Sequence, residues 1–155
     1  MNTLIAPPRT DPIHVSSEKV VDIDISRVFA YVADLRNTPA WNRAITSTRP
    51  LAPGTTGVGS RFEQTRTVPR RATETVEITD YEADRLLDVT VTDRGHPVQY
   101  RYEFHPGTVA RTRIRLTVTL YPDHPIGRPD YYRARLARVL DSNLTNLRTA
   151  LLSSR

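Results

Sequence analysis

The chain has 155 residues, of which 38% are hydrophobic and 25% charged, with a formal net charge of +5 and no cysteine. This length suits one domain that buries roughly 70% of the surface of its unfolded chain. The absence of cysteine excludes disulfide scaffolds, thiolate metal sites and cysteine nucleophiles.

The basic residues do not indicate a nucleic-acid partner. All 22 of them except Lys19 are arginine, and they are interleaved with 17 acidic residues. They accompany no helix-turn-helix, zinc-finger or stacking-aromatic motif. We therefore expect no nucleic-acid binding.

The first 12 residues, MNTLIAPPRTDP, have neither a basic start nor a sustained apolar run, so they do not have the pattern of a signal peptide or anchor. We expect residues 1–12 to form a flexible lead-in and residues 13–155 to form a single domain. We also expect no stable membrane insertion, with the cytoplasm as the default location.

Residues 13–23 alternate approximately between apolar and polar side chains, which predicts a first strand. Ser26 can cap a short helix over residues 27–34, which carries apolar side chains at helical spacing. Pro39 suits the first turn of a second short helix that carries Trp41, the only tryptophan. Two short helices are therefore predicted after the first strand.

Six further segments have strand character and are separated by short turn-forming stretches. They span residues 45–51, 58–68, 72–82, 86–92, 98–105 and 109–121. Connections this short require antiparallel neighbours, because a parallel crossover needs a dozen or more residues. This half of the chain is predicted to be a meander.

The last two strands can be paired through a three-residue turn at Pro106, Gly107 and Thr108, which places Glu103 opposite Arg111. This register gathers the apolar side chains of both strands on one face. They are Val98, Tyr100, Tyr102, Ile114 and Leu116, with Thr112 among them. The other face is expected to be solvated and to carry Arg111, Arg113 and Arg115.

Residues 130–152 are predicted to form one long helix. Its apolar side chains recur every three or four residues as a continuous stripe. The stripe consists of Tyr132, Leu136, Leu140, Leu144, Leu147 and Leu151, with Asn143 beside it. No internal repeat, low-complexity block or composition shift indicates a second domain.

The order of strand, two short helices, six-strand meander and long helix resembles the helix-grip architecture of the START-related superfamily, which includes the birch-pollen-allergen fold. Five stretches are similar to its bacterial polyketide cyclase/dehydrase branch, also called SRPBCC: ISRVFAYVAD, Pro39 with Trp41, GVGSRF, EITDYEADRLL and LDSNLTNLRTALL. The resemblance implies an α+β fold, in which a curved seven-stranded antiparallel sheet wraps the long helix and the short helices close the other side.

The resemblance also implies an apolar cavity between sheet and helix that binds a hydrophobic or aromatic small molecule, lipid-like or polyketide-like. The candidate ligand-binding residues are Trp41 near the rim, Phe62, Tyr100, Tyr102, Phe104, Ile114 and Leu116 on the sheet, and Leu140, Asn143, Leu144 and Leu147 on the helix. The alternative is that these side chains only pack a core.

No catalytic motif is visible. The four histidines, His14, His96, His105 and His124, have no metal-ligand spacing, so neither a metal nor another cofactor is expected. The glycine-rich run at residues 57–62 lacks the third glycine of a dinucleotide loop and leads into a predicted strand. Its glycines are more consistent with a tight turn.

Two other functions stay open. One is a polyketide aromatase/cyclase that catalyses aldol cyclisation and dehydration, with Tyr100, Tyr102 and Asn143 as inward polar candidates and with Glu74 and Glu77 as carboxylates of unassigned facing. The other is a lipid or quinone chaperone that meets an anionic membrane through basic residues. The sequence predicts no particular oligomeric state.

Overall fold

The computed structural model describes residues 11–68, 70–93, 97–122 and 124–154. The strands are β1 (Ile13–Val21), β2 (Ile45–Pro50), β3 (Arg61–Arg66), β4 (Ala72–Glu82), β5 (Leu86–Val91), β6 (Val98–Pro106) and β7 (Thr112–Leu120). The helices are α1 (Ile25–Ala33), the 3-10 turn η1 (Leu35–Asn37), α2 (Thr38–Trp41) and α3 (Pro129–Ser153). His96 and most of the predicted lead-in, residues 1–10, lie outside the described residues.

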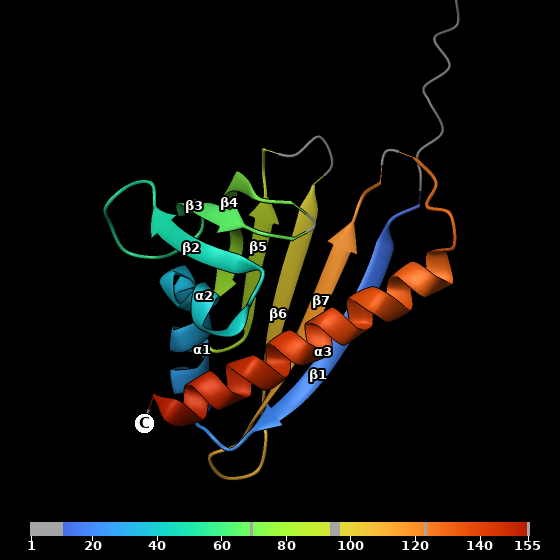
Figure 1. Cartoon of the computed structure of the whole chain (residues 1–155). Helices are drawn as coiled ribbons and strands as arrows, with labels where there is room; N and C mark the ends of the chain where they lie inside the picture. The colour runs from blue at the N-terminus through green and yellow to red at the C-terminus, as the bar shows by residue number, and fades with distance from the viewer. Residues whose placement is uncertain (1–10, 69, 94–96, 123, 155) are drawn as a thin grey trace, which may run out of the picture.

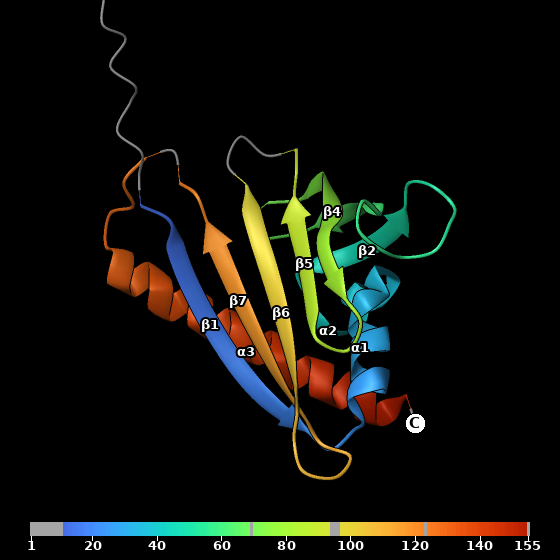
Figure 2. The same ribbon diagram turned by 180° about the vertical axis from the view of Figure 1, so that it is seen from behind.

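All seven strands form one antiparallel sheet in the order β1-β7-β6-β5-β4-β3-β2. Strands β2 to β7 are neighbours in chain order, as the short connections predicted, and β1 pairs with β7. The sheet curves around α3, while α1 and α2 lie beside the other half of the sheet (Figures 1 and 2). The expected α+β helix-grip fold is confirmed.

Helix α1 is capped by Asp24, so the predicted cap at Ser26 is wrong by two residues. Asp24 has an extended backbone, with φ −60° and ψ 142°, and its carboxylate accepts a hydrogen bond from the Ser26 backbone N–H at 3.2 Å. This contact satisfies one of the free donors of the first helical turn. The Ser26 hydroxyl instead donates to Asp84 at 2.8 Å, in the turn between β4 and β5.

The pairing of β6 with β7 is shifted by four residues from the predicted register. Glu103 lies opposite Arg115, not Arg111, and the connection spans residues 107–111 in place of a three-residue turn. Within this wider loop the Gly107 N–H donates to the Arg111 carbonyl at 2.8 Å. The connection is therefore longer than the three-residue turn that Pro106, Gly107 and Thr108 suggested, and β7 begins at Thr112.

The shift is an even number of residues, so each side chain stays on its predicted face. Arg111, Arg113 and Arg115 are exposed, as predicted. Their acidic partners lie elsewhere, because Arg111 Nε is 2.8 Å from Asp22 and Arg115 Nε is 3.6 Å from Glu18. The outer face of the sheet is thus polar, and the inner face is left for the core.

The core lies between the inner face of the sheet and the helices. Phe29 of α1 packs edge-on against Phe104 of β6, with ring centroids 5.1 Å apart. Helix α3 buries the later part of its leucine stripe, namely Leu140, Leu144, Leu147 and Leu151. The first part of the stripe is different, because Tyr132 is 36% exposed. The core therefore covers the second half of α3 and leaves its first turns outside.

Candidate functional site

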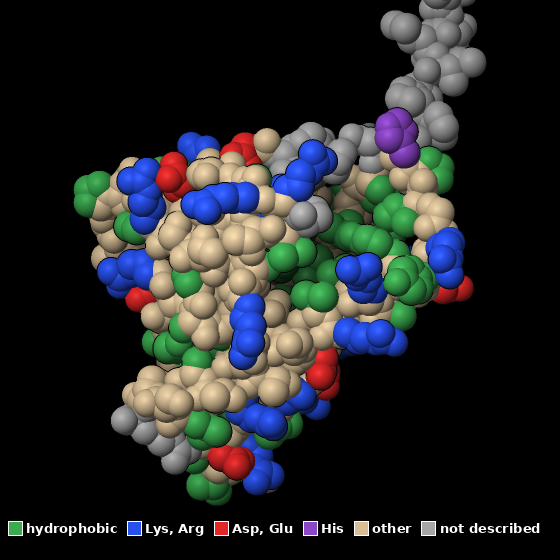
Figure 3. All heavy atoms as spheres, viewed as in Figure 1, with side chains coloured by type: hydrophobic (Ala, Val, Ile, Leu, Met, Phe, Trp, Pro, Cys, Tyr) green, Lys and Arg blue, Asp and Glu red, His purple; other side chains and the backbone are tan. Residues whose placement is uncertain are grey.

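A pocket of about 280 Å³ lies where the first half of α3 extends past the packed core. The helix contributes one wall, formed by Tyr132, Arg135, Leu136, Val139, Leu140 and Asn143. The sheet contributes the floor, formed by Val98 and Tyr100 of β6 and by Val118 and Leu120 of β7. The space-filling view shows a hollow in this region with hydrophobic side chains inside and basic side chains around it (Figure 3).

The remaining wall comes from segments that lie far from α3 in the sequence. It consists of Asn42, Ala44 and Ile45, which follow α2, and of Arg66, Val68 and Glu74 from the β3–β4 hairpin. The segment after α2 is tied to this hairpin by a hydrogen bond from the Thr67 N–H to the Ala44 carbonyl at 2.8 Å. The curvature of the sheet therefore brings its far edge round to face α3.

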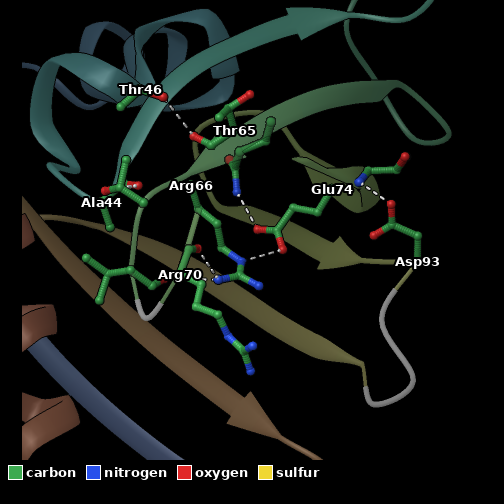
Figure 4. A network of polar contacts seen from close by, with 11 residues as sticks. Ala44, Thr46, Thr65, Arg66, Arg70, Glu74 and Asp93 are labelled. Atoms are coloured by element: carbon green, nitrogen blue, oxygen red, sulfur yellow. Dashed lines mark hydrogen bonds and ion pairs between the residues drawn. The ribbon is translucent and has the colours of Figure 1, made fainter. Parts of the chain in front are cut away.

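A polar cluster occupies this wall of an otherwise largely apolar pocket. Glu74 is only 5% exposed, and its Oε2 accepts from Arg66 Nε at 3.1 Å while its Oε1 accepts from Gln64 Nε2 at 3.1 Å. Figure 4 shows Arg66 of β3 and Glu74 of β4 pointing toward one another. Both charges are largely removed from water, and each compensates the other.

The structure also decides the facing of the two carboxylates on β4. Glu74 lies on the same face as the buried Val76, so it belongs to the interior. Glu77 lies on the opposite face, where its carboxylate is 3.7 Å from Arg61 Nε. Of the two, Glu74 is the acidic group placed for chemistry in the pocket.

Arg66 is held by its backbone neighbours as well as by Glu74. Its Nη1 donates to the carbonyls of Val68 at 3.3 Å and Arg70 at 2.9 Å. Within the described part of the chain its Nη2 has no hydrogen-bond partner. Nε and Nη1 are therefore committed to the protein, and Nη2 keeps its N–H groups for a further acceptor.

Tyr100 and Tyr102 share the inner face of β6 but have different surroundings. Tyr100 lines the pocket, whereas Tyr102 is buried against Trp41. Burial raises the pKa of the Tyr102 phenol above its ordinary value, and the nearby Tyr100 raises it further. Tyr102 therefore remains neutral at physiological pH and acts as a packing residue.

Among the candidate ligand-binding residues, Tyr100, Leu140 and Asn143 line the pocket. The others belong to the buried core and do not line it. They are Trp41, Phe62, Tyr102, Phe104, Ile114, Leu116, Leu144 and Leu147. The expectation that Trp41 lies near the rim is wrong, because its side chain is 2% exposed. The alternation of apolar and polar residues identifies the whole inner face of the sheet, whereas the pocket occupies only one end of that face.

Sequence reasoning missed Arg66 and Arg135 and left Glu74 unassigned. A signal for Arg66 was present, because Phe62, Gln64 and Arg66 alternate along one strand. If the phenylalanine faces inward, the arginine must also face inward, and a buried arginine requires an acidic partner. Arg135 directly precedes Leu136 of the apolar stripe, which places it at the border of the face that α3 turns to the sheet.

Three further features of the described residues concern metal ions, the membrane and the glycine-rich run. They contain no group of three or more histidine, aspartate or glutamate side chains that could hold a metal ion. None of the helices within these residues is long and apolar enough to cross a bilayer. The glycine-rich run forms a turn before β3, in which Gly59 has φ +90° and donates its N–H to the Ile78 carbonyl at 2.8 Å.

A family model described as polyketide cyclase / dehydrase and lipid transport matches residues 12–152. No curated protein shows significant sequence similarity to the chain. Similar solved structures include that of Ara h 8.0201, with a TM-score of 0.71 and 15% identity. TTHA0849 from Thermus thermophilus has a TM-score of 0.75 and 16% identity. A START superfamily protein from Mycobacterium smegmatis has a TM-score of 0.77 and 13% identity. Each alignment covers 92% of this chain and 99% of the other.

Proposed function

Because the chain belongs to the polyketide cyclase / dehydrase and lipid transport family, we propose that it binds a hydrophobic small molecule in the pocket between α3 and the sheet. The observation that carries this proposal is the pocket itself, with Leu136, Val139 and Leu140 facing Val98 and Val118 across it. Apolar lining with a few placed polar groups is the usual composition of a small-molecule site. A lipid, a quinone or an aromatic polyketide would satisfy this composition.

The size of the pocket limits what it can enclose. Its volume of about 280 Å³ is close to the lower end of ligand sites and corresponds to roughly nine water-sized groups. Burial of about six methylene groups would contribute roughly 5 kcal/mol before the cost of association. We therefore expect weak binding of a plain alkyl chain, with longer ligands projecting from the mouth.

The proposal is tested by closing the mouth of the pocket. Val139, which is 47% exposed, lines the pocket, so Val139→Trp should fill the entrance. Leu152→Trp is the matched control, because Leu152 lies on the same helix, is 43% exposed and does not line the pocket. Binding of octan-1-ol, measured by calorimetry, should be lost in the first variant and kept in the second.

Native mass spectrometry of the protein purified without detergent should in addition reveal any ligand that it retains from its host. Two results would refute binding in this pocket. One is the absence of binding of octan-1-ol, octanoate and octylammonium alike to the unmodified protein. The other is equal binding of octan-1-ol by the Val139→Trp and Leu152→Trp variants.

A second candidate function, the cyclisation of a poly-keto chain, is favoured by the buried Glu74 beside Arg66. The Glu74 carboxylate would take a proton from a methylene group between two carbonyls, and Arg66 Nη2 would donate to the resulting enolate oxygen. The enolate carbon would then attack a second carbonyl of the same chain, and the alkoxide formed would take the proton back from Glu74. Glu74 would next remove a second proton from the same carbon and deliver it to the departing hydroxyl, which would leave as water. The chain and its own carbonyls supply every atom of this step.

This second function predicts a specific dependence on Glu74. Glu74→Gln keeps the shape of the side chain but removes the base, so turnover of a poly-keto substrate should fall at least a hundredfold while binding is retained. Glu77→Gln, on the outer face of the same strand, should leave turnover unchanged. A Glu74→Gln variant that retains full turnover would exclude this mechanism.

A further inference from the structure

The pocket carries an excess of positive charge. Among the residues that the structure describes, the ionised side chains lining the pocket are Arg66, Arg135 and Glu74. Glu74 is compensated by Arg66, whose Nε lies 3.1 Å from the carboxylate. Within this described lining, the positive charge of Arg135 has no acidic partner.

Arg135 differs from the neighbouring arginine on α3. Arg133 has an acidic partner, with Nη1 3.8 Å from Asp130. Arg135 lies on the pocket side of the helix and forms no ion pair or hydrogen bond with any of the described residues. Its exposed side chain can therefore move toward a ligand without breaking an existing contact.

The second available donor belongs to Arg66, which lines the pocket. Arg66 Nη2 carries N–H groups that no described residue accepts, although the rest of the same guanidinium is bound to Glu74 and two carbonyls. The bound Nε and Nη1 hold Nη2 in place before any ligand arrives. Pre-organised guanidinium donors pair well with planar carboxylates, and exclusion of water strengthens such pairs.

We propose that the pocket selects amphipathic carboxylates, whose head lies between Arg66 Nη2 and Arg135 and whose apolar tail lies along Leu136 and Leu140. This inference rests on the proposed binding function and specifies its ligand class. The single uncompensated charge matches a monoanion. A cationic head would be repelled by Arg66 and Arg135, because the carboxylate of Glu74 is already paired with Arg66.

Three probes with eight carbon atoms each test the choice of head group: octanoate, octan-1-ol and octylammonium. Calorimetry at pH 7.5 and low salt should give octanoate an affinity at least tenfold higher than octan-1-ol, with octylammonium the weakest. If octan-1-ol or octylammonium binds as tightly as octanoate, the charge selection is refuted and the apolar binding site stands. If none of the three binds, the proposed function itself falls.

Two variants with opposite expected effects locate the selection. Arg135→Gln removes the uncompensated charge from an exposed position, so octanoate affinity should fall about tenfold while octan-1-ol affinity stays constant. Glu74→Gln removes the competing anion and should raise octanoate affinity severalfold. Arg133→Gln makes the same charge change as Arg135→Gln outside the pocket and is its control. Equal loss of octanoate affinity in both arginine variants would show a general charge effect and overturn the proposal.

Discussion

Trp41 packs edge-on against Tyr102, with ring centroids 6.2 Å apart and ring planes at 89°. The contact joins α2 to β6, and both side chains are buried, with 2% and 7% exposure. Two residues earlier on the same face of β6, Tyr100 lines the pocket. The boundary between the packed core and the pocket therefore falls between two tyrosines on one strand.

This position of Trp41 predicts a large loss of stability when its ring is removed. Trp41→Ala should lower the free energy of unfolding by about 3–5 kcal/mol, because it leaves a cavity in the core. Tyr132→Ala, at the exposed mouth of the pocket, should cost less than about 1 kcal/mol. Urea denaturation followed by circular dichroism measures both. Comparable losses in the two variants would place Trp41 at the rim.

Trp41→Phe separates the packing of the ring from its polar group. The indole Nε1 is buried and has no hydrogen-bond partner in the described part of the chain. Loss of that nitrogen should therefore forfeit no hydrogen bond, and Trp41→Phe should cost clearly less than Trp41→Ala. A loss equal to that of Trp41→Ala would show that Nε1 is bound.

The two glutamates of β4 should differ in their contribution to stability. Glu74→Ala leaves Arg66 without its carboxylate in a largely buried site, which should cost about 3 kcal/mol. Glu77→Ala removes a partly exposed partner 3.7 Å from Arg61 and should cost about 0–1 kcal/mol. Thermal or chemical unfolding checks the difference. Equal costs would contradict the inward position of Glu74.

The buried phenol of Tyr102 should make the protein sensitive to alkaline pH. Its pKa is raised in the folded state by burial and by Tyr100, whereas in the unfolded chain it ionises near pH 10. Unfolding then releases a proton, so stability is complete below about pH 10 and decreases as the pH rises above it. This group contributes a slope of at most about 1.4 kcal/mol per pH unit.

Tyr102→Phe should remove that slope, because phenylalanine does not ionise. Tyr131→Phe, whose ring is 57% exposed, serves as the matched control and should keep it. Urea midpoints measured between pH 8 and pH 11 compare the two variants. Parallel pH profiles for Tyr102→Phe and the unmodified protein would be evidence against a buried phenol.

The register of β6 and β7 can be tested with cysteine pairs, since the chain contains no cysteine of its own. Glu103 and Arg115 are directly opposite, and opposite Cα atoms in antiparallel pairs are about 4.5–5.5 Å apart, within the range of a disulfide. The Glu103→Cys, Arg115→Cys variant should therefore form a disulfide on mild oxidation. Glu103→Cys with Arg111→Cys should stay reduced. Mass spectrometry distinguishes them, and the reverse result would restore the three-residue turn.

The sequence by itself determined the elements, their order and the faces of the residues in the last two strands. These properties depend on short-range causes, namely the period of the side chains and the backbone preferences of the turn residues. The faces of β6 and β7 survived an error of four residues in register because alternation has a period of two. The leucine stripe likewise located α3 to within a residue or two at each end.

Only the tertiary structure decided the register of the last hairpin, the inward position of Glu74 and the place of the pocket. Arg111 is drawn to Asp22, 89 residues away, and Glu74 faces inward with partners supplied by β3. A pocket lies where side chains from distant segments fail to meet, so no single segment encodes it. Tyr100 lines that space and Tyr102 does not, because α3 extends past the core over one of them while Trp41 packs against the other.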